Sequence, residues 1–244
     1  MSASRLQGLV LAGGEGTRLG SLGTPKPLVS VADEALIVHA VRALDGVGCR
    51  PIHCLVREPF ATAAAAVVRA YNADVVVEPC LTPSSLHTLG LGLQRGPGPW
   101  MVTMVDTIMP DRAWAAFARA ASRALARSAD VVLGITSFVD DESPLRVRVG
   151  VDGRAMAIGP RAEQSPWVTA GVYAFSPRVA ERVPEALAQG IARLRGFLGW
   201  ALGTDLCIFT VELPMTVDVD RPSDLAVASS MLEGSDGQGT RQGR

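Results

Sequence analysis

A glycine-rich turn followed by two basic residues is the part of this chain best suited to chemistry. The apolar run Leu9–Leu11 leads directly into Gly13–Gly16, which holds three glycines, so a buried strand is expected to end in a turn with almost no side chains. Such a turn can close around a bulky anion and present backbone N–H groups to it. Arg18 and Lys26 add two cations to the same loop. Together these residues predict a binding site for a polyphosphate such as a nucleoside triphosphate.

The spacing excludes two other phosphate-binding loops. The dinucleotide motif G-x-G-x-x-G can start at Gly14 and Gly16, but Leu19 stands where its third glycine should be. The Walker A motif needs a Gly-Lys-Ser/Thr sequence, whereas Lys26 lies between two prolines.

The loop resembles the signature of the nucleotidyltransferases. The sequence LAGGEGTRL at Leu11–Leu19 and PKPL at Pro25–Leu28 resemble those of sugar-1-phosphate nucleotidylyltransferases, of cytidylyltransferases acting on small phosphoalcohols, and of molybdenum-cofactor guanylyltransferases. The spacer between Arg18 and Lys26 is shorter than in typical sugar-1-phosphate enzymes. The resemblance implies that Arg18 and Lys26 are catalytic, and that the nucleotide contacts Leu11, Ala12, Gly13, Gly14, Gly16, Thr17 and Arg18.

Nucleotidyl transfer also needs a counter-charge, because an acceptor phosphate must approach an α-phosphate of the same sign. A divalent cation held by carboxylates supplies it. Asp106 follows the apolar run Trp100–Val105, and the carboxyl ends of strands in an open α/β sheet face the ligand. The resemblance implies a metal-binding aspartate here. A helix-capping role for Asp106 is disfavoured because Pro110 and Asp111 lie nearer the helix that follows.

A second carboxylate is expected from Thr216–Leu225. Its sequence TVDVDRPSDL resembles the closing motif of the same enzymes, a D-x-D or D-x-G followed by a helix. Asp218 and Asp220 are two positions apart, so on a strand both would project from one face. Asp224 suits a helix cap. The expected Mg²⁺ ligands are Asp106, Asp218 and Asp220, with the choice between the last two open.

The segment Thr82–Leu89 is the candidate for base and ribose contacts, which the resemblance implies for Pro83, Ser84 and Ser85. Its Ser-Leu-x-x-Leu form is most like that of the cytidylyltransferases. Cytidine is therefore expected first, with guanosine or uridine as alternatives. The two serines can also cap the following helix, and this does not exclude the first role.

Acceptor contacts are expected from Trp167–Pro177. This segment resembles the N-A-G-I-Y-x-F strand of the same enzymes, in which a glycine, here Gly171, permits close approach of the acceptor. Thr169 replaces the usual asparagine.

Two pairs of arginines could bind an acceptor phosphate. Arg146 and Arg148 alternate with apolar residues, so they share one face of a strand, and a solvated strand face explains them equally well. For Arg193 and Arg195 the same two explanations remain open, namely an acceptor-phosphate site and a solvated surface.

Composition restricts the class of protein. The chain has 244 residues, 48% of them hydrophobic, and a net charge of −1, which argues against nucleic-acid and membrane-surface partners. No apolar stretch approaches the roughly 20 residues of a membrane span, and Met1–Gly8 lacks the apolar core of a signal peptide. The four cysteines lack zinc-type spacing and are expected to be reduced in a cytoplasmic protein; they are Cys49, Cys54, Cys80 and Cys207.

Strand-like and helix-like segments alternate in the first half of the chain. This predicts an α/β fold, namely a three-layer, doubly wound, mostly parallel Rossmann-like sheet. An antiparallel hairpin is expected over Leu145–Ile158, where Asp152-Gly153 marks the turn. Residues 1–232 are expected to form one domain, and residues 233–244, rich in glycine and polar residues, a disordered tail.

Two functional classes remain. The first is an enzyme that joins the nucleoside monophosphate of an NTP to a small phosphorylated acceptor by direct in-line displacement, since no G-x-S-x-G nucleophile motif is present. The second is a nucleotide-sensing regulatory subunit without turnover. A sensor need not keep Lys26 together with the metal-binding acids, so the enzyme is favoured. The sequence does not specify the acceptor or the oligomeric state.

Overall fold

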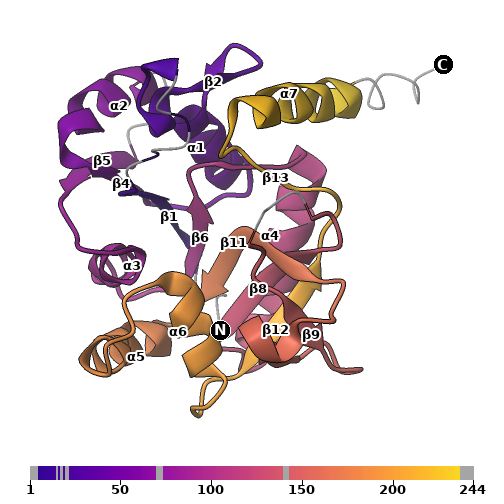
Figure 1. Cartoon of the computed structure of the whole chain (residues 1–244). Helices are drawn as coiled ribbons and strands as arrows, with labels where there is room; N and C mark the ends of the chain where they lie inside the picture. The colour runs from indigo at the N-terminus through magenta and orange to yellow at the C-terminus, as the bar shows by residue number, and fades with distance from the viewer. Residues whose placement is uncertain are drawn as a thin grey trace.

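The computed structural model describes residues 5–14, 16, 19, 22–69, 74–139 and 143–236. Its centre is a seven-stranded sheet with the strand order β12-β8-β11-β6-β1-β4-β5, seen in Figure 1. The strands of this sheet are β1 (Gln7–Ala12), β4 (Ile52–Arg57), β5 (Val75–Cys80), β6 (Trp100–Met104), β8 (Val131–Thr136), β11 (Val168–Phe175) and β12 (Ile208–Glu212).

Six of these seven strands run in one direction, which confirms the mostly parallel sheet. β1 pairs in parallel with β4 and β6, β4 with β5, and β8 with β12, whereas β11 is antiparallel to both of its neighbours. The carboxyl ends of the six strands therefore share one edge of the sheet with the start of β11. This edge collects the ends of β1 and β6 and the residues around Thr169.

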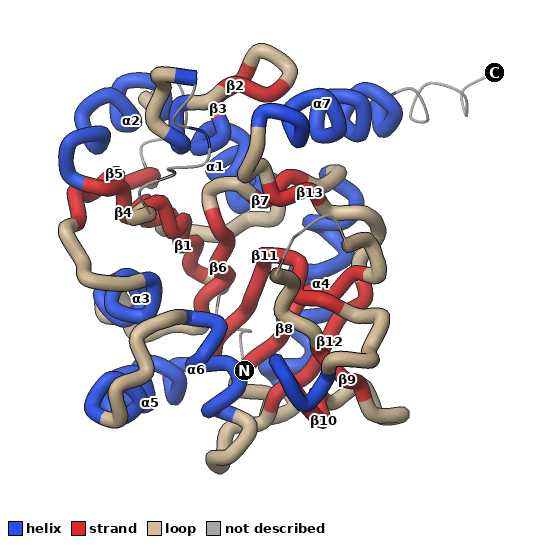
Figure 2. Tube along the Cα trace, viewed as in Figure 1, coloured by secondary structure: helices blue, strands red, loops and turns tan. Residues whose placement is uncertain are grey.

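Helices cover both faces of the sheet, so the fold has three layers (Figure 2). One hydrophobic core packs the sheet against α1 (Leu36–Gly46), α2 (Ala61–Val68) and α4 (Asp111–Ala126). A second core packs the opposite face against α3 (Ser85–Leu93), α5 (Pro177–Ala188) and α6 (Leu194–Ala201). The five inner strands bury side chains on both faces, which explains their continuous apolar runs in the sequence.

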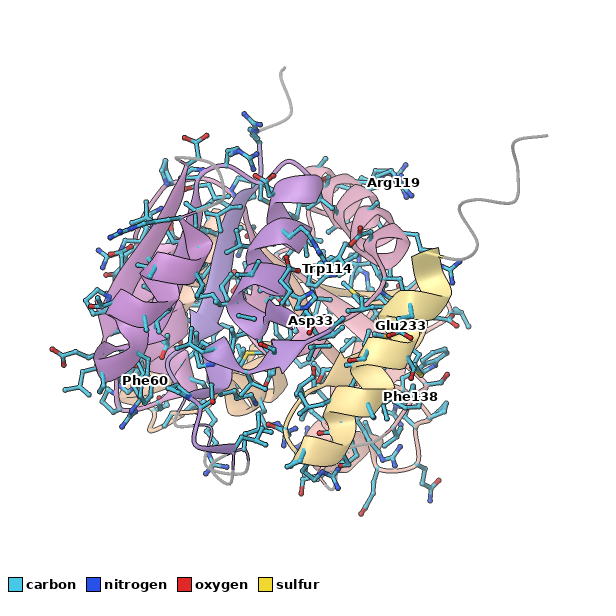
Figure 3. All side chains as sticks on the ribbon, turned by 90° about the horizontal axis from the view of Figure 1, so that it is seen from above. Asp33, Phe60, Trp114, Arg119, Phe138 and Glu233 are labelled. Carbon is cyan, nitrogen blue, oxygen red and sulfur yellow. The ribbon has the colours of Figure 1, made fainter. Side chains whose placement is uncertain are left out.

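Helix α4 shows how sequence spacing directs packing. Trp114 and Phe117, three positions apart, lie on one face and are almost fully buried. Arg119 lies on the outer side of the helix, whereas Trp114 points toward the centre of the molecule (Figure 3). Trp114 also donates its indole N–H to the carbonyl of Met109 at 3.1 Å, which fixes the start of the helix against the sheet.

The second half of the chain contains the expected hairpin, in which β9 (Val147–Val149) pairs antiparallel with β10 (Ala155–Ile158). Two small antiparallel pairs were not predicted from the sequence, because each strand has only two residues. One joins β2 (Ser30–Val31) to β3 (Glu34–Ala35), and the other joins β7 (Thr107–Ile108) to β13 (Val217–Asp218).

The segment before β5 forms a 3₁₀ turn, η3 (Glu58–Phe60), and α2, which ends at Val68; residues 70–73 lie outside the described residues. One expected boundary is wrong. Helix α7 (Pro222–Asp236) continues past residue 232, so the first four residues of the expected tail are helical. Residues 237–244 lie outside the described residues.

Two smaller findings complete the fold. None of the described helices combines the length and apolar character needed to cross a membrane. All four cysteines are free thiols, and three of them are buried. The remaining short elements are the 3₁₀ turns η2 (Lys26–Leu28) and η4 (Gly159–Ala162).

Candidate active site

The glycine turn after β1 leaves open space on one side and closes onto Lys26 on the other. A Cβ atom on Gly14 would meet nothing within 4 Å, whereas one on Gly16 would lie 2.6 Å from Cβ of Lys26. Gly16 also has φ +62°, a conformation that glycine adopts without strain. The turn thus requires glycine at residue 16 and leaves room beside Gly14. Thr17 and Arg18 lie outside the described residues.

Lys26 joins two carboxylates that are distant in sequence. Its Nζ contacts Asp106 and lies 2.5 Å from Oδ1 of Asp220. The side chains of Lys26 and Asp106 are only 12% and 13% exposed, and that of Asp220 is 33% exposed. Burial alone would lower the pKa of the Lys26 ammonium, but the charges and hydrogen bonds of the two aspartates raise it above its ordinary value. Lys26 is therefore a permanent cation at this point.

The backbone explains why these acids meet. Strands β7 and β13 pair so that Thr107 lies opposite Asp218, and the N–H of Val219 donates to the carbonyl of Asp106 at 3.0 Å. This pairing brings the end of β6 beside the chain that leads into α7. The predicted convergence of the two acidic segments is thus present.

Asp220 is further fixed by the cap of α7. The carboxylate of Asp224 accepts hydrogen bonds from the backbone N–H groups of Asp220 and Arg221, at 2.9 and 2.7 Å. This confirms Asp224 as a helix cap, and the cap holds Asp220 in place.

Asp218 faces a different partner from Asp220. Its Oδ1 accepts a hydrogen bond of 2.9 Å from the hydroxyl of Thr107. Gly171, at φ +70°, packs so closely that a Cβ there would lie 2.0 Å from that hydroxyl. The Asp218 side chain is exposed to the threonine chamber, but neighbouring protein atoms partly desolvate its carboxyl group. This desolvation and repulsion from Asp106 raise the pKa of the Asp218 carboxyl to about 7.

The expected cluster of three metal ligands is not formed. In the described part of the chain, no group of three or more His, Cys, Asp or Glu side chains is arranged to hold a metal ion. Asp106 and Asp220 instead direct their oxygens at one point, which Nζ of Lys26 occupies. Mg²⁺ is commonly held by one or two carboxylates completed by waters and phosphates, so this pair fits such an ion.

Three adjoining chambers lie here, and residues of this cluster line two of them. The central chamber is lined by the glycine turn and by the acids with Lys26, the serine chamber by the turn before α3, and the threonine chamber by residues from β8, β11 and β13. The central chamber is lined by Leu11, Ala12, Gly14, Gly16, Lys26, Pro27, Met104, Val105, Asp106, Arg193 and Asp220. The serine chamber shares three of these residues and is lined by Leu11, Gly13, Gly14, Arg57, Thr82, Pro83, Ser84, Ser85, Thr88 and Met104. The threonine chamber meets the central one at Asp220 and is lined by Thr136, Phe138, Val139, Pro144, Leu145, Val168, Thr169, Arg195, Thr216, Val217, Asp218, Asp220 and Arg221.

The serines of the expected base segment line their chamber, but their hydroxyls contact protein. Ser84 Oγ contacts the carbonyl of Ala192 and lies 2.8 Å from Nδ1 of His87, and Ser85 Oγ accepts from the N–H of Leu194 at 3.0 Å. Ser84 stands at the N-cap position of α3, but its hydroxyl makes no capping hydrogen bond to that helix. The capping role considered for Ser84 is therefore wrong, because its hydroxyl bonds to the segment before α6 instead.

The two arginines on the hairpin strand do not reach the threonine chamber. Arg146 donates to the carbonyl of Ser165 at 2.6 Å, and Arg148 lines a separate hollow beside Pro160 and Trp167. Although the backbone of Arg146 pairs with Val168, neither arginine lines the threonine chamber together with Thr169. The alternating pattern identified the strand but could not show which side of the hairpin faces the cleft.

The cations of the cleft come from elsewhere. Arg193 lines the central chamber, and Arg195 and Arg221 line the threonine chamber. Sequence reasoning left Arg193 and Arg195 undecided and did not consider Arg221 or Thr107. The adjacency of Arg221 to Asp220 was the available signal, since a residue beside a site acid lies near the site.

Comparison with known proteins agrees with this arrangement. The model of the MobA-like NTP transferase domain matches residues 8–199, most of the chain.

The chain belongs to this family. The match includes the glycine turn, Lys26, Asp106 and the Arg193–Arg195 segment, and it ends before Asp218 and Asp220. The resemblance drawn from the signature loop is thereby confirmed, and the chemistry of the family is nucleotidyl transfer.

Solved structures similar to this NTP transferase domain share its fold at low sequence identity. The inositol-1-phosphate CTP transferase of T. maritima has a TM-score of 0.78 and 18% identity, covering 93% of this chain and 96% of its own. A putative glucose-1-phosphate thymidylyltransferase of Bacillus anthracis has a TM-score of 0.80 and 18% identity, covering 93% and 94%. A CMP:2-keto-3-deoxy-manno-octonic acid synthetase solved with CTP has a TM-score of 0.70 and 17% identity, covering 93% and 98%.

Curated relatives match a short segment only. The mannose-1-phosphate guanylyltransferase catalytic subunit beta of Drosophila melanogaster is 48% identical over 46 residues. This segment is 18% of this chain and 12% of the relative. The protein of Drosophila pseudoobscura pseudoobscura matches to the same extent.

Proposed function

We propose that this NTP transferase domain transfers the nucleoside monophosphate of an NTP, CTP first, to the phosphate of a small phosphorylated acceptor. The acceptor class is a sugar-1-phosphate, a phosphoalcohol or a phosphonate, and pyrophosphate is released. One observation carries the proposal: Lys26, Asp106 and Asp220 share ion pairs in the central chamber, at the point where Asp220 also lines the threonine chamber. An anionic reaction with two substrates needs such a meeting point.

Each chamber suits one part of the reactants. We assign the base and ribose to the serine chamber, which is lined by Pro83, Ser84 and Ser85. The central chamber suits the triphosphate, because the open space beside Gly14 leaves room for a bulky anion and Lys26 and Arg193 add positive charge. The threonine chamber suits the acceptor, because Arg195 faces it.

The chemistry is a single in-line displacement. An oxygen of the acceptor phosphate attacks the α-phosphorus of the NTP and forms the new P–O bond. The bond from the α-phosphorus to the bridging oxygen breaks, and pyrophosphate leaves with the electron pair. Lys26 stabilises the negative charge that grows on the leaving group, and we assign the same role to Arg18. Catalysis then consists of positioning and charge neutralisation.

A divalent cation is part of the proposal, and Mg²⁺ is the expected one. Asp106 and Asp220 would hold it, with Asp218 close enough to add negative charge to the same field. When bound, such an ion lowers the repulsion between the two reacting phosphates. Asp218 is held by Thr107, so we assign the ligand role to Asp220 in preference to it.

Cytidine is the base to test first. Two of the similar structures are described as a CTP transferase and a synthetase with CTP, although a thymidylyltransferase and guanylyltransferases are also similar. The hydroxyls of Ser84 and Ser85 are already bonded within the protein. We therefore expect the backbone of the Pro83–Ser85 turn, more than these hydroxyls, to recognise the base.

The test is a panel of four NTPs crossed with phosphorylated acceptors, with pyrophosphate release as the readout and Asp106→Asn as the inactive control. We expect release only when both substrates are present, with the highest kcat/KM for CTP. A higher kcat/KM for ATP or GTP would contradict the base assignment. Tight NTP binding without release for any pair would instead favour the nucleotide-sensing alternative.

A further inference from the structure

Hydrogen bonds join the segment at the start of α6 (residues 192–194) to the turn at the start of α3 (residues 84–86). The N–H of Leu194 donates to Ser85 Oγ at 3.0 Å, although the residues are 109 positions apart. In return, the N–H of Leu86 donates to the carbonyl of Ala192 at 3.1 Å, and the Ser84 hydroxyl contacts the same carbonyl. The two segments therefore behave as one unit.

Ser85 performs a specific task in this contact. Leu194 is the first residue of α6, so its N–H has no partner within that helix. Arg193 at the N-cap position makes no capping hydrogen bond with its side chain. The Ser85 hydroxyl satisfies this N–H from another element, and without it a buried donor would lose its partner.

Leu194 anchors two arginines that diverge from it. Its side chain is 4% exposed, while Arg193 and Arg195 on either side are exposed. Arg193 lines the central chamber, and Arg195 lines the threonine chamber. The position of one buried leucine thus sets the direction of two cations toward two different chambers.

The reaction needs these cations. Both substrates are anionic, and the ammonium of Lys26 is already shared by two carboxylates. Additional positive charge must therefore come from groups such as Arg193 and Arg195, held at a defined distance from the phosphates. A loosened segment would lose the preorganisation on which electrostatic stabilisation depends.

We propose that Ser85 is a positioning residue, which holds Arg193 against the nucleotide phosphates and Arg195 against the acceptor. This inference rests on the proposed function and adds a coupling between chambers. The turn that lines the serine chamber also fixes the arginines of the other two chambers, so correct seating of the base and correct orientation of the acceptor depend on one hydrogen-bonded unit.

The first experiment measures nucleotide binding and does not require turnover. Calorimetry with CTP, or with whichever of the four NTPs binds the wild type most tightly, compares Ser85→Ala, Arg193→Gln and the double variant. We expect Ser85→Ala to weaken binding several-fold, and we expect almost no further loss when it is added to Arg193→Gln, since the two residues act through each other. Additive losses would overturn the proposal.

The second experiment measures kcat/KM for the acceptor. Ser85→Ala should lower it by roughly tenfold, the scale of one lost hydrogen bond to a buried donor, with no further loss in an Arg195→Gln background. Ser85→Thr keeps the hydroxyl and should retain most of the activity. If Ser85→Ala does not fold, the test is kcat/KM for the acceptor in Arg195→Gln. An unchanged value in that variant would overturn the proposal.

Ser176→Ala is the matched control. The Ser176 hydroxyl donates to Asp130 at 2.9 Å, at the end of β11 opposite the cleft, so its loss should lower the thermal midpoint without changing kcat/KM. If kcat/KM falls in proportion to the thermal midpoint in both Ser85→Ala and Ser176→Ala, the role of Ser85 is structural only. A wild type that binds NTP but releases no pyrophosphate would contradict the proposed function, while the binding cycle would still decide the role of Ser85.

Discussion

The Nζ atom of Lys26 lies 2.5 Å from Oδ1 of Asp220, a residue 194 positions further along the chain. The same atom contacts Asp106. A cation from the loop after β1 is therefore held between acids from the end of β6 and the start of α7. Polyphosphate entering the central chamber must compete with these carboxylates for the ammonium group. If the ammonium turned toward the phosphates, the two carboxylates would be left facing each other and could hold a divalent cation.

We predict that Lys26→Ala lowers kcat by on the order of 10²-fold or more, the scale for removing one preorganised electrostatic contact. The reason is that charge on the leaving pyrophosphate grows in the transition state. Steady-state kinetics on a variant with an unchanged circular-dichroism spectrum checks it. An unchanged kcat with a raised KM would show that Lys26 only binds substrate.

We predict that Lys26→Met binds Mn²⁺ more tightly than the wild type in the absence of nucleotide. The wild-type ammonium occupies the point toward which both carboxylates are directed, and methionine has similar length without the charge. Electron paramagnetic resonance of free Mn²⁺ measures the affinity. Equal affinities in the two proteins would mean that the ion binds elsewhere, and Asp106→Asn in the Lys26→Met background should remove the gain.

The sequence predicted much of the fold because the major elements are long and strongly patterned. The strands of the main sheet and the amphipathic α4 follow directly from apolar runs and from spacings of three and four residues. The two-residue strands β7 and β13 carry no such pattern, since two residues have no period. Yet this pair aligns Thr107 with Asp218, so the feature that assembles the acids was invisible in the sequence.

Within the site, motif residues were easier to predict than their partners. The glycine turn, Lys26, Asp106 and Asp220 follow from recognisable patterns and lie together. Asp218 was expected to act beside Asp220, but the β7–β13 pairing gives it Thr107 as a partner. Arg195 reaches the threonine chamber because Leu194 is anchored by a distant serine, and no local pattern records such a contact.

Asp106→Asn should nearly abolish turnover while nucleotide binding in metal-free buffer survives or tightens. The substitution removes one negative charge from the central chamber and one carboxylate from the pair that would hold the cation. Pyrophosphate release and calorimetry with EDTA present measure the two effects. Full wild-type activity in excess EDTA would contradict the metal-assisted mechanism itself.

Truncation after Glu233 should leave the thermal midpoint and the activity unchanged. Helix α7 continues to Asp236, but Glu233 and Gly234, where the chain would be cut, are exposed, and the removed sequence is rich in glycine and polar residues, so we expect it to contribute little to stability. A second truncation before Ser229 should lower the midpoint. It removes the contact of the Ser229 hydroxyl with the N–H of Ala32, 3.3 Å, and the apolar residues packed on the core. A drop of several degrees for the shorter truncation would show that the tail docks.

Asp218 should make the stability of the metal-free protein depend on pH near neutrality. Its pKa is raised to about 7 from 3.8, so between these values the folded state holds a proton that the unfolded state has lost. The stabilisation is complete below about pH 4 and is lost as the pH rises through about 7. With EDTA present, the thermal midpoint should therefore fall on going from about pH 5 to about pH 8. Asp218→Asn should reduce this fall, because its amide cannot ionise but can still accept the Thr107 hydrogen bond.

The matched control for this pH prediction is Asp33→Asn, which removes an exposed carboxyl in the turn between β2 and β3. This variant should keep the wild-type slope of the midpoint against pH. Differential scanning calorimetry at several pH values measures all three proteins. Identical slopes for wild type and Asp218→Asn would mean that solvent already screens the Asp218 carboxylate from its neighbours in the free protein. In that case Asp218 would carry its charge at neutral pH, and we would assign it a role as a third metal ligand beside Asp106 and Asp220.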